Sequence, residues 1–291
     1  MTVIEFMKKF SDDDVCLEHL METRFGVEHE CGKCGKRNKF SRVKARPVYQ
    51  CSWCAHQISP CAGTPMHRTR TPLTSWFYAM FLFTTTRHGV PAKELQRQLG
   101  VTYKTAWRMG HEIRKYMAEL DGDAPLGGSG SDVEVDETYV GGKREGKRGR
   151  GADGKTVVFG MLERDGRVMT KVVPDAKTHS IRPHITENVE EGTTVHSDEW
   201  WAYRGLNGDG YAHETVNHGA KEWARGNTHV NTLESYWSQI KRSIKGTHIA
   251  VSGKHMSKYL GEFEFCYNLR KTPEQMLPRI LSFQPCGLKH S

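Results

Sequence analysis

Residues 156–173 read Thr-Val-Val-Phe-Gly-Met-Leu-Glu-Arg-Asp-Gly-Arg-Val-Met-Thr-Lys-Val-Val. Two apolar runs, 156–162 and 168–173, flank the segment Arg-Asp-Gly-Arg at 164–167. An Asp-Gly pair between two apolar runs is a strong signal for a tight β-hairpin turn. This stretch therefore predicts a β-hairpin, and the neighbouring segments can be interpreted around it.

The segments on either side of the hairpin predict an α/β domain over residues 132–291. The alternating run Val-Glu-Val-Asp at 133–136 predicts a strand before the hairpin. After the hairpin, the pattern predicts further elements in this order: a helix at 178–189, a strand at 193–196 and a helix at 233–245. Three strands, a helix, a strand and a later helix are typical of a single α/β domain of ordinary size.

Three acidic residues lie at informative places in this pattern. Asp136 ends the run 133–136, and Asp198 closely follows the run 193–196. Thirty-five residues separate Asp198 from Glu234, which lies in the predicted helix 233–245. Carboxylates from two strand ends and a helix can hold two divalent metal ions, which can activate water and stabilise a leaving oxygen at a phosphodiester. Hard oxygen ligands of this kind suit Mg²⁺.

The predicted helix 233–245 and the residues just before it bring further polar groups toward the same site. Asn231 precedes Glu234 by three residues, and Lys241 follows Glu234 by seven. Residues at these spacings lie on roughly one face of a helix, so one cleft could receive an amide, a carboxylate and an ammonium group. Lys241 would then be placed to contact a DNA phosphate. The alternative is that each of these groups is a solvated surface residue.

The cysteines predict a zinc site near the N-terminus. Cys31 and Cys34 form one Cys-x-x-Cys pair, Cys51 and Cys54 form another, and 16 residues separate the two pairs. Each pair can present two thiolates, and two pairs complete a tetrahedral Zn²⁺ site. Disulfide bonding is the alternative. The other four cysteines have no such spacing and are interpreted as buried or incidental thiols, with Cys61 or His56 a weak substitute ligand.

The zinc ribbon is expected at residues 28–62, with strands around 39–42 and 47–51. Before it, in residues 1–27, the acids after Ser11 predict a short helix at 12–24. A Gly-, Ser- and Pro-containing segment at 121–131 has the composition of a linker and marks the boundary to the α/β domain.

Residues 63–120 are expected to be helical. An aromatic helix begins at Thr74-Ser75 and is followed by two shorter helices, the first starting at Pro91 and the second capped by Thr102. Gly100-Val101 separates these two, which predicts a helix-turn-helix. Lys104 and Arg108 would project from its second helix toward base edges or phosphates. The alternative is an ordinary helical hairpin in a core.

A glycine-rich basic loop follows the first predicted strand. Residues 141–150 include Lys143 and Arg144. Such a loop is expected to be solvated and mobile in the free protein, and it could become ordered on DNA phosphates beside Asp136.

The bulk composition indicates the kind of partner and argues against two classes of protein. Lys and Arg outnumber Asp and Glu 42 to 34, a net charge of +8 that favours a polyanionic partner. No segment approaches the roughly 18 apolar residues of a membrane span. No apolar stretch follows Lys8-Lys9, so a secretory signal is not expected. The expected location is therefore the cytoplasm.

At this point the chain resembles the DDE transposases of prokaryotic insertion sequences that carry an N-terminal zinc ribbon and an ISXO-two-like transposase domain. The resemblance runs over nearly the whole chain. It rests on the two cysteine pairs and on these segments in order: Gly63-Thr64-Pro65-Met66-His67, Thr71-Pro72-Leu73-Thr74-Ser75-Trp76, Ala106-Trp107-Arg108-Met109, Val135-Asp136-Glu137-Thr138-Tyr139-Val140-Gly141-Gly142-Lys143, His196-Ser197-Asp198, His229-Val230-Asn231-Thr232-Leu233-Glu234, Lys241-Arg242-Ser243-Ile244-Lys245-Gly246 and residues 255–268.

The resemblance implies a ribonuclease-H-like catalytic domain that nicks the ends of a mobile element and transfers them into target DNA. Asp136 and Asp198 would be ligands of two Mg²⁺ or Mn²⁺ ions. The third ligand is Glu234 or Asn231, because some family members use asparagine there. Glu234 is preferred, since a carboxylate neutralises metal charge. Lys241 and Arg242 would contact DNA.

The implied partners are double-stranded DNA, both the terminal inverted repeats and the target, and a second copy of the chain when bound to DNA. The zinc ribbon and helix-turn-helix would recognise the repeats. Two other functions use the same features: a DNA-binding regulator without catalysis, and a structure-specific repair nuclease that hydrolyses DNA without joining it.

Overall fold

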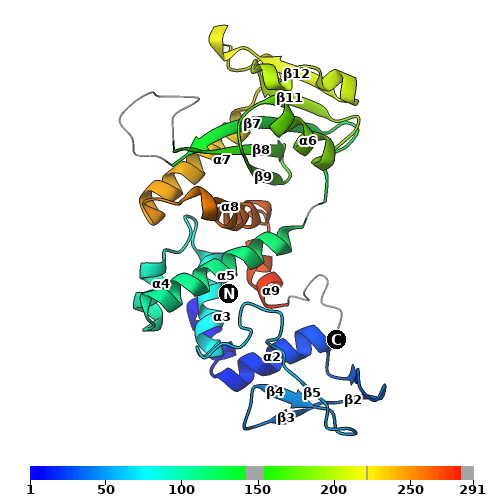
Figure 1. Cartoon of the computed structure of the whole chain (residues 1–291), viewed down its shortest axis with the longest axis vertical. Coiled ribbons are helices and arrows are strands. Elements are labelled where there is room, and N and C mark those ends of the chain that lie inside the picture. The colour runs from blue at the N-terminus through cyan, green and yellow to red at the C-terminus, as the bar shows by residue number, and fades with distance from the viewer. Residues whose placement is uncertain (123, 142–153, 221, 283–291) are drawn as a thin grey trace. The chain divides into compact units, whose positions relative to one another are not determined.

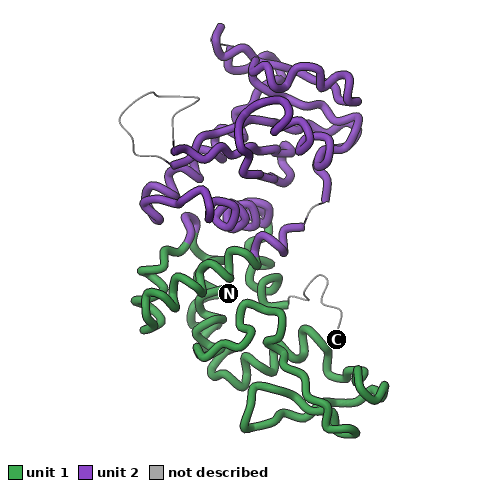
Figure 2. Tube along the Cα trace, in the orientation of Figure 1, with its two compact units in different colours: residues 1–86, 90–116, 272–291 green, residues 87–89, 117–271 purple. Residues whose placement is uncertain are grey.

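The computed structural model describes residues 1–122, 124–141, 154–220 and 222–282. These residues form two compact units, drawn in green and purple in Figure 2. The first unit combines residues 1–86 and 90–116 with the segment from 272 onward, and the second combines 87–89 with 117–271. The domain boundaries expected from composition differ from this division, because the segment after Lys271 groups with the N-terminal unit.

The first unit consists of helices and short antiparallel strands (Figure 1). Its elements are α1 (Val3–Lys9), α2 (Asp13–Phe25), β1 (His29–Glu30), β2 (Arg37–Asn38), β3 (Ser41–Val43), β4 (Val48–Gln50), β5 (Gln57–Ile58), α3 (Leu73–Thr85), α4 (Ala92–Leu99), the first part of α5 (Tyr103–Asp121), the 3₁₀ turn η5 (Pro273–Gln275) and α9 (Met276–Leu281). Strands β1 and β2 form one small sheet, and β3, β4 and β5 form another.

Local sequence explains three helix boundaries in this unit. The Asp12 carboxylate accepts a hydrogen bond from the Val15 amide (2.9 Å) and so caps α2, close to the helix expected there. Gly100 ends α4 in the left-handed conformation, with φ of 64°. The Thr102 hydroxyl accepts from the Thr105 amide (3.2 Å) and caps α5. Two helices joined at this glycine were expected, although α5 is much longer than a short second helix.

The second unit contains a five-stranded sheet with helices on both faces. Its elements are β6 (Leu126–Gly127), β7 (Asp132–Val140), β8 (Thr156–Glu163), β9 (Val168–Val173), α6 (Thr178–Asn188), β10 (Val189–Glu190), β11 (Thr194–Asp198), η1 (Trp201–Tyr203), η2 (Leu206–Asp209), β12 (Ala212–Val216), η3 (His218–Ala220), α7 (Asn231–Ser243), η4 (Ile244–His248) and α8 (Gly253–Asn268).

The strand order of the large sheet is β12-β11-β7-β8-β9. The strands β7, β8 and β9 are antiparallel neighbours, which confirms the hairpin expected at the turn 164–167. Strand β11 pairs in parallel with both β7 and β12. The connection between β9 and β11 contains α6, as the helix expected at 178–189 requires.

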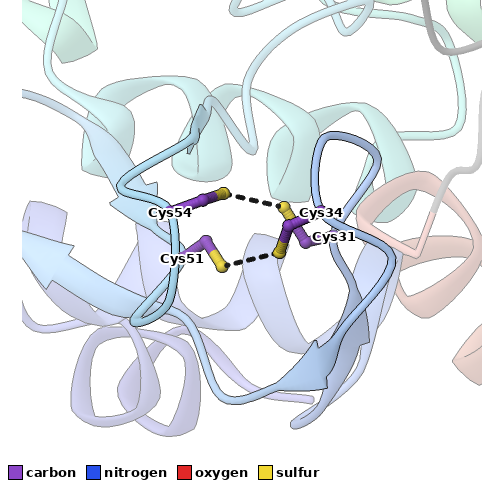
Figure 3. A group of neighbouring side chains, drawn as sticks. All are labelled: Cys31, Cys34, Cys51 and Cys54. Carbon is purple, nitrogen blue, oxygen red and sulfur yellow. Dashed lines mark hydrogen bonds between the residues drawn. The ribbon is translucent and has the colours of Figure 1, made fainter.

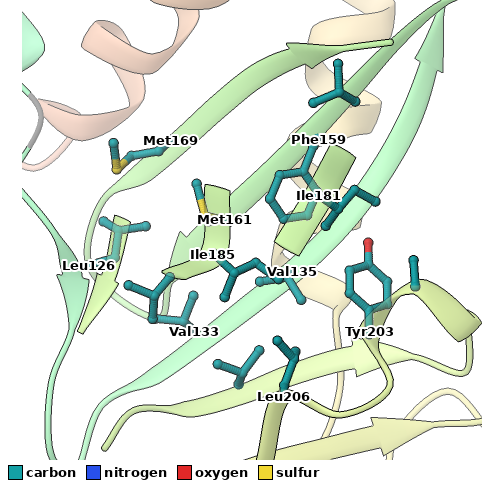
Figure 4. Close-up of a cluster of buried hydrophobic side chains, with 14 of the residues drawn as sticks. Leu126, Val133, Val135, Phe159, Met161, Met169, Ile181, Ile185, Tyr203 and Leu206 are labelled. Atoms are coloured by element: carbon teal, nitrogen blue, oxygen red, sulfur yellow. The ribbon is translucent and has the colours of Figure 1, made fainter. Parts of the chain in front are cut away.

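Alternating side chains on each strand divide the core into two layers. On one face, Val133, Val135 and Phe159 pack with Ile181 and Ile185 of α6 (Figure 4). A second set of buried residues covers the opposite face with α7 and α8: Val140, Val158, Leu162, Leu233, Trp237, Leu260 and Phe263. Consequently, the even-numbered residues of β7 and β8 face α7.

Three features of this unit differ from the sequence-based expectations. Strand β7 continues to Val140, so Asp136 lies within the strand and not at its end. Within the expected linker, residues 124–131 are packed, because Leu126 is fully buried and β6 pairs in parallel with β10. The helix expected at 233–245 begins at Asn231 and passes into a π-helical segment, η4.

No helix within the described ranges has the length and apolar character needed to cross a membrane.

Candidate functional site

The four predicted cysteines come together in the first unit. The sulfur atoms of Cys31 and Cys54 are 3.6 Å apart, and those of Cys34 and Cys51 are 3.9 Å apart (Figure 3). In the described part of the chain, no other set of three or more His, Cys, Asp and Glu side chains brings its ligand atoms within 4.8 Å of one another.

These distances fit a zinc ion. A tetrahedral site with Zn–S bonds of about 2.3 Å separates its sulfurs by about 3.8 Å, whereas a disulfide requires about 2.05 Å. Although burial opposes it, the backbone amides of Cys54 and Trp53 lower the pKa of the Cys51 thiol to about 6. A thiolate at this position is the form that binds metal. The four-cysteine cluster therefore supports a structural zinc, and neither Cys61 nor His56 belongs to it.

The first two predicted carboxylates extend from neighbouring strands. The paired register of β7 and β11 ends with Glu134 opposite His196. Two residues further along, each strand carries an aspartate, Asp136 on β7 and Asp198 as the last residue of β11. Because these positions continue the same alternation as Glu134 and His196, both carboxylates are on the α7 side of the sheet. The Asp198 carboxylate also accepts the Trp200 amide at 2.9 Å.

The third predicted carboxylate comes from α7. Glu234 lies in the first turn of this helix, and Asn231 is the first helical residue. Trp237, one turn further on, donates its indole N–H to the Asp136 carboxylate (3.1 Å) and so connects α7 to β7. Gly160, opposite Asp136 on β8, leaves room for this ring, since a β-carbon there would lie 2.4 Å from it.

The negative charges act on one another. Burial and the charges of Glu137, Asp198 and Glu234 hold the pKa of the Asp136 carboxyl well above its usual range. Mutual repulsion of this kind makes the site receptive to positive charge. Asp198 and Glu234 are therefore each within electrostatic range of Asp136, although the three carboxylates do not form a compact cluster with all oxygens inside 4.8 Å.

Lys241 is close enough to Asp136 for the Asp136 charge to affect the pKa of Lys241. Desolvation of its ammonium group lowers the pKa of Lys241, and the Asp136 charge opposes that shift. Arg242 is exposed, and its guanidinium donates to the Ser238 carbonyl one turn earlier (3.3 Å). Lys241 is also exposed, and of this basic pair it is the residue whose charge interacts with that of Asp136.

A second layer of residues around Glu234 had not been expected. The His218 Nδ1 atom lies 3.8 Å from the Glu234 carboxylate. The Glu199 carboxylate accepts the amides of His218 (2.9 Å) and Gly219 (3.1 Å), which fixes the loop that carries the histidine. Trp223 is 57% exposed, and its ring centre lies 4.9 Å from that of His218. The adjacency of Glu199 to Asp198 was the only sequence signal for this group.

The predicted DNA-contacting residues have different surroundings. Lys104 is exposed on α5. The Arg108 guanidinium lies over the Trp76 ring, 5.6 Å from its centre, so it also has a partner within its own unit. Trp107, also on α5, is 39% exposed and packs against His111. The predicted contacts Lys143 and Arg144 lie outside the described residues.

Comparison with known proteins matches two families. Residues 125–268 match the model described as the ISXO2-like transposase domain, and residues 11–57 match the transposase zinc-ribbon domain.

Two curated relatives are also similar. An uncharacterized protein in the transposable element ISH50 of Halobacterium salinarum is 31% identical over 297 residues, which cover 94% of this chain and 98% of that protein. An uncharacterized transposase-like protein of Haemophilus influenzae is 26% identical over 110 residues, which cover 38% of this chain and 88% of that protein.

Proposed function

Because this chain belongs to the family of insertion-sequence transposases with an ISXO2-like transposase domain, we propose that it cleaves the ends of its element and joins them to target DNA. The observation that carries this proposal is that the charges of Asp198 on β11 and Glu234 on α7 both act on Asp136 on β7. The raised pKa of Asp136, caused by burial and by its acidic neighbours, supports their closeness. The antiparallel β7, β8 and β9 extended by the parallel strands β11 and β12 support a ribonuclease-H-like domain.

The donor set suits a pair of divalent ions. Bound Mg²⁺ or Mn²⁺ would supply Lewis acidity at the attacking and leaving oxygens of the phosphodiester. Carboxylate oxygens are the hard ligands that such ions prefer. Asp136, Asp198 and Glu234 would hold these ions.

The other residues of the site would bind the DNA substrate. Lys241 would hold a phosphate as a point charge on the same side as Asp136. The exposed ring of Trp223, supported by His218, offers a surface on which a base near the cleaved phosphate can stack. Asn231, one turn before Glu234, would donate or accept a hydrogen bond at the rim.

The first unit would recognise the ends. Its zinc ribbon and the α4–α5 pair, read as a helix-turn-helix, would bind the terminal inverted repeats, with Lys104 and Arg108 near the DNA. The basic balance of the chain supports this assignment. A second copy would assemble on the paired ends.

The test is an assay in which purified protein, Mg²⁺, pre-cut element ends and a target plasmid are combined. Asp136→Asn, Asp198→Asn and Glu234→Gln should each lower joining by at least about 10³-fold while binding to the ends stays near normal. Asn231→Ala serves as the comparison for the third position.

The alternatives give different results in this assay. Cleavage of intact ends without joining would indicate a nuclease, and binding without either reaction would indicate a regulator. Full activity of Glu234→Gln together with an inactive Asn231→Ala would assign the third ligand to Asn231.

A further inference from the structure

Glu134 is a fully buried carboxylate, with no exposed side-chain surface, two residues before Asp136 on β7. Its side chain extends from the same face of the strand as Asp136, toward α7. Burying an ionised carboxylate is costly unless it is paired and hydrogen-bonded. The partners of Glu134 therefore indicate what the residue does.

Glu134 caps the helix that carries Glu234. One carboxylate oxygen accepts the backbone amide of Leu233 (2.9 Å), and the other accepts the Thr232 hydroxyl (2.9 Å). The residue at the N-cap of α7 is Val230, which makes no side-chain capping bond. The cap that most helices obtain from their own sequence is supplied here from a neighbouring strand. A negative charge at this end also complements the helix dipole.

Arg164 connects this cap to the chain that enters α7. Its Nε atom donates to Glu134 (2.9 Å), and its two terminal nitrogens donate to the carbonyls of Asn227 (2.7 Å) and His229 (2.8 Å). The His229 Nδ1 atom lies 3.1 Å from the same Glu134 oxygen that Arg164 contacts. One buried ion pair therefore fixes both the first turn of α7 and the three residues that lead into it.

We propose that Glu134 is a positioning residue, which holds α7 at the rotation and depth that direct Glu234 toward Asp136. This proposal rests on the function proposed above. The capped amide belongs to Leu233, the residue immediately before Glu234, so any shift of the cap moves the carboxylate directly. A displacement of about 1 Å within a catalytic group can cost about 10²-fold in rate.

Glu134→Gln is the informative change, because it keeps the size of the side chain but removes its charge. Glutamine has one acceptor oxygen, and its amide group would face the donors of Thr232, Leu233 or Arg164. The matched control is Glu264→Gln. Glu264 is an enclosed carboxylate on α8 that accepts the Thr170 amide (3.0 Å) and hydroxyl, on β9.

The experiment measures three properties of the full-length protein: joining of pre-cut ends at saturating DNA, Mn²⁺ binding to the DNA-free protein by electron paramagnetic resonance, and thermal unfolding. Glu134→Gln should lower the joining rate per folded molecule about 10²-fold and weaken Mn²⁺ binding, with end binding within about twofold of wild type. Glu264→Gln should leave joining and Mn²⁺ binding unchanged.

A milder variant keeps the inference testable if Glu134→Gln does not fold. Thr232→Val removes one hydrogen bond to Glu134 and should lower joining severalfold. A rate per folded molecule and a Mn²⁺ affinity equal to wild type, in whichever Glu134 or Thr232 variant folds, would reduce Glu134 to a structural role. If wild type binds Mn²⁺ but joins no DNA, the proposed function fails, whereas the Mn²⁺ comparison still tests Glu134.

Discussion

At the scale of residues, the charge balance around Asp136 governs the candidate site. Three acidic neighbours and burial raise the pKa of Asp136, while Lys241 contributes a positive charge on the same side. A divalent ion would relieve this excess of negative charge, whereas a phosphate needs a cation beside it. The two kinds of residue therefore have separable roles.

Lys241→Ala should lower joining about tenfold at saturating DNA, because a charge-assisted contact to phosphate is lost. Mn²⁺ binding to the free protein should stay normal. Lys245→Ala is the control, since Lys245 is an exposed lysine in the neighbouring segment η4. Equal, near-normal joining by both variants would remove Lys241 from the site.

A second residue-scale prediction concerns pH and stability. Burial raises the pKa of Glu264 from about 4.5 to about 7, although hydrogen bonds from Thr170 oppose the shift. The folded protein thus binds this proton more tightly than the unfolded chain does. The resulting stabilisation is present in full below pH 4.5 and is lost as the pH rises to about 7.

Glu264→Gln should remove this pH dependence. Relative to wild type, its free energy of unfolding should rise by an amount on the order of 3 kcal/mol between these two pH values. Urea denaturation at acidic and slightly alkaline pH measures the difference. Parallel stability curves for the two proteins would show that Glu264 titrates normally.

At the scale of elements, the packing of α7 on the sheet depends on Gly160. A β-carbon at this position would lie 2.4 Å from the Trp237 ring, which also donates to Asp136. Gly160→Ala should cost about 1–3 kcal/mol of stability. It should also lower joining by more than the loss of folded protein explains, because α7 must move.

Gly208→Ala is the control for this substitution, since no atom lies within 4 Å of the added β-carbon. Wild-type joining and stability in Gly160→Ala would mean that α7 adjusts without cost. Measuring both variants by thermal unfolding and by the joining assay separates the two effects.

The zinc ribbon is the second element-scale feature. Cys51→Ser should abolish the bound zinc, expected at one ion per chain, and unfold residues around β1 to β5, because the metal supplies much of the folding energy of so small a module. Cys61→Ser, at a buried cysteine outside the cluster, should keep its zinc. Elemental analysis and hydrogen exchange measure both outcomes. A full complement of zinc in Cys51→Ser would contradict the four-cysteine site.

At the scale of the whole molecule, the sequence predicted what local patterns encode. The hairpin β8–β9, helix α6, the capped helix α2 and the cysteine cluster each depend on residues near one another or on a fixed spacing. The three carboxylates were predicted as a group because each lies at a predicted strand or helix. Whether they act together as metal ligands remains a prediction of the sequence that the geometry supports.

Features that depend on distant partners were not foreseen. Segments far away in the chain stabilise helix α8 and strand β12. Such segments also bury Leu126. Glu134 is a single residue that illustrates this. The alternation of side chains along its strand predicts that it is exposed. Its burial is explained only by Arg164 and by the first turn of α7, which lie 30 and 98 residues later.

Because α9 belongs to the first unit, it also constrains the order in which the two units fold during synthesis. Helix α9 packs against α3 and buries Met276, Leu277, Ile280 and Leu281, yet the ribosome synthesises it after the entire second unit. Domains generally fold as they emerge from the ribosome. The nascent chain can therefore complete its sheet before the unit proposed to bind DNA has its last helix. Premature termination within the second unit would leave apolar surface on α3 uncovered, which favours degradation of the fragment over its binding to element ends.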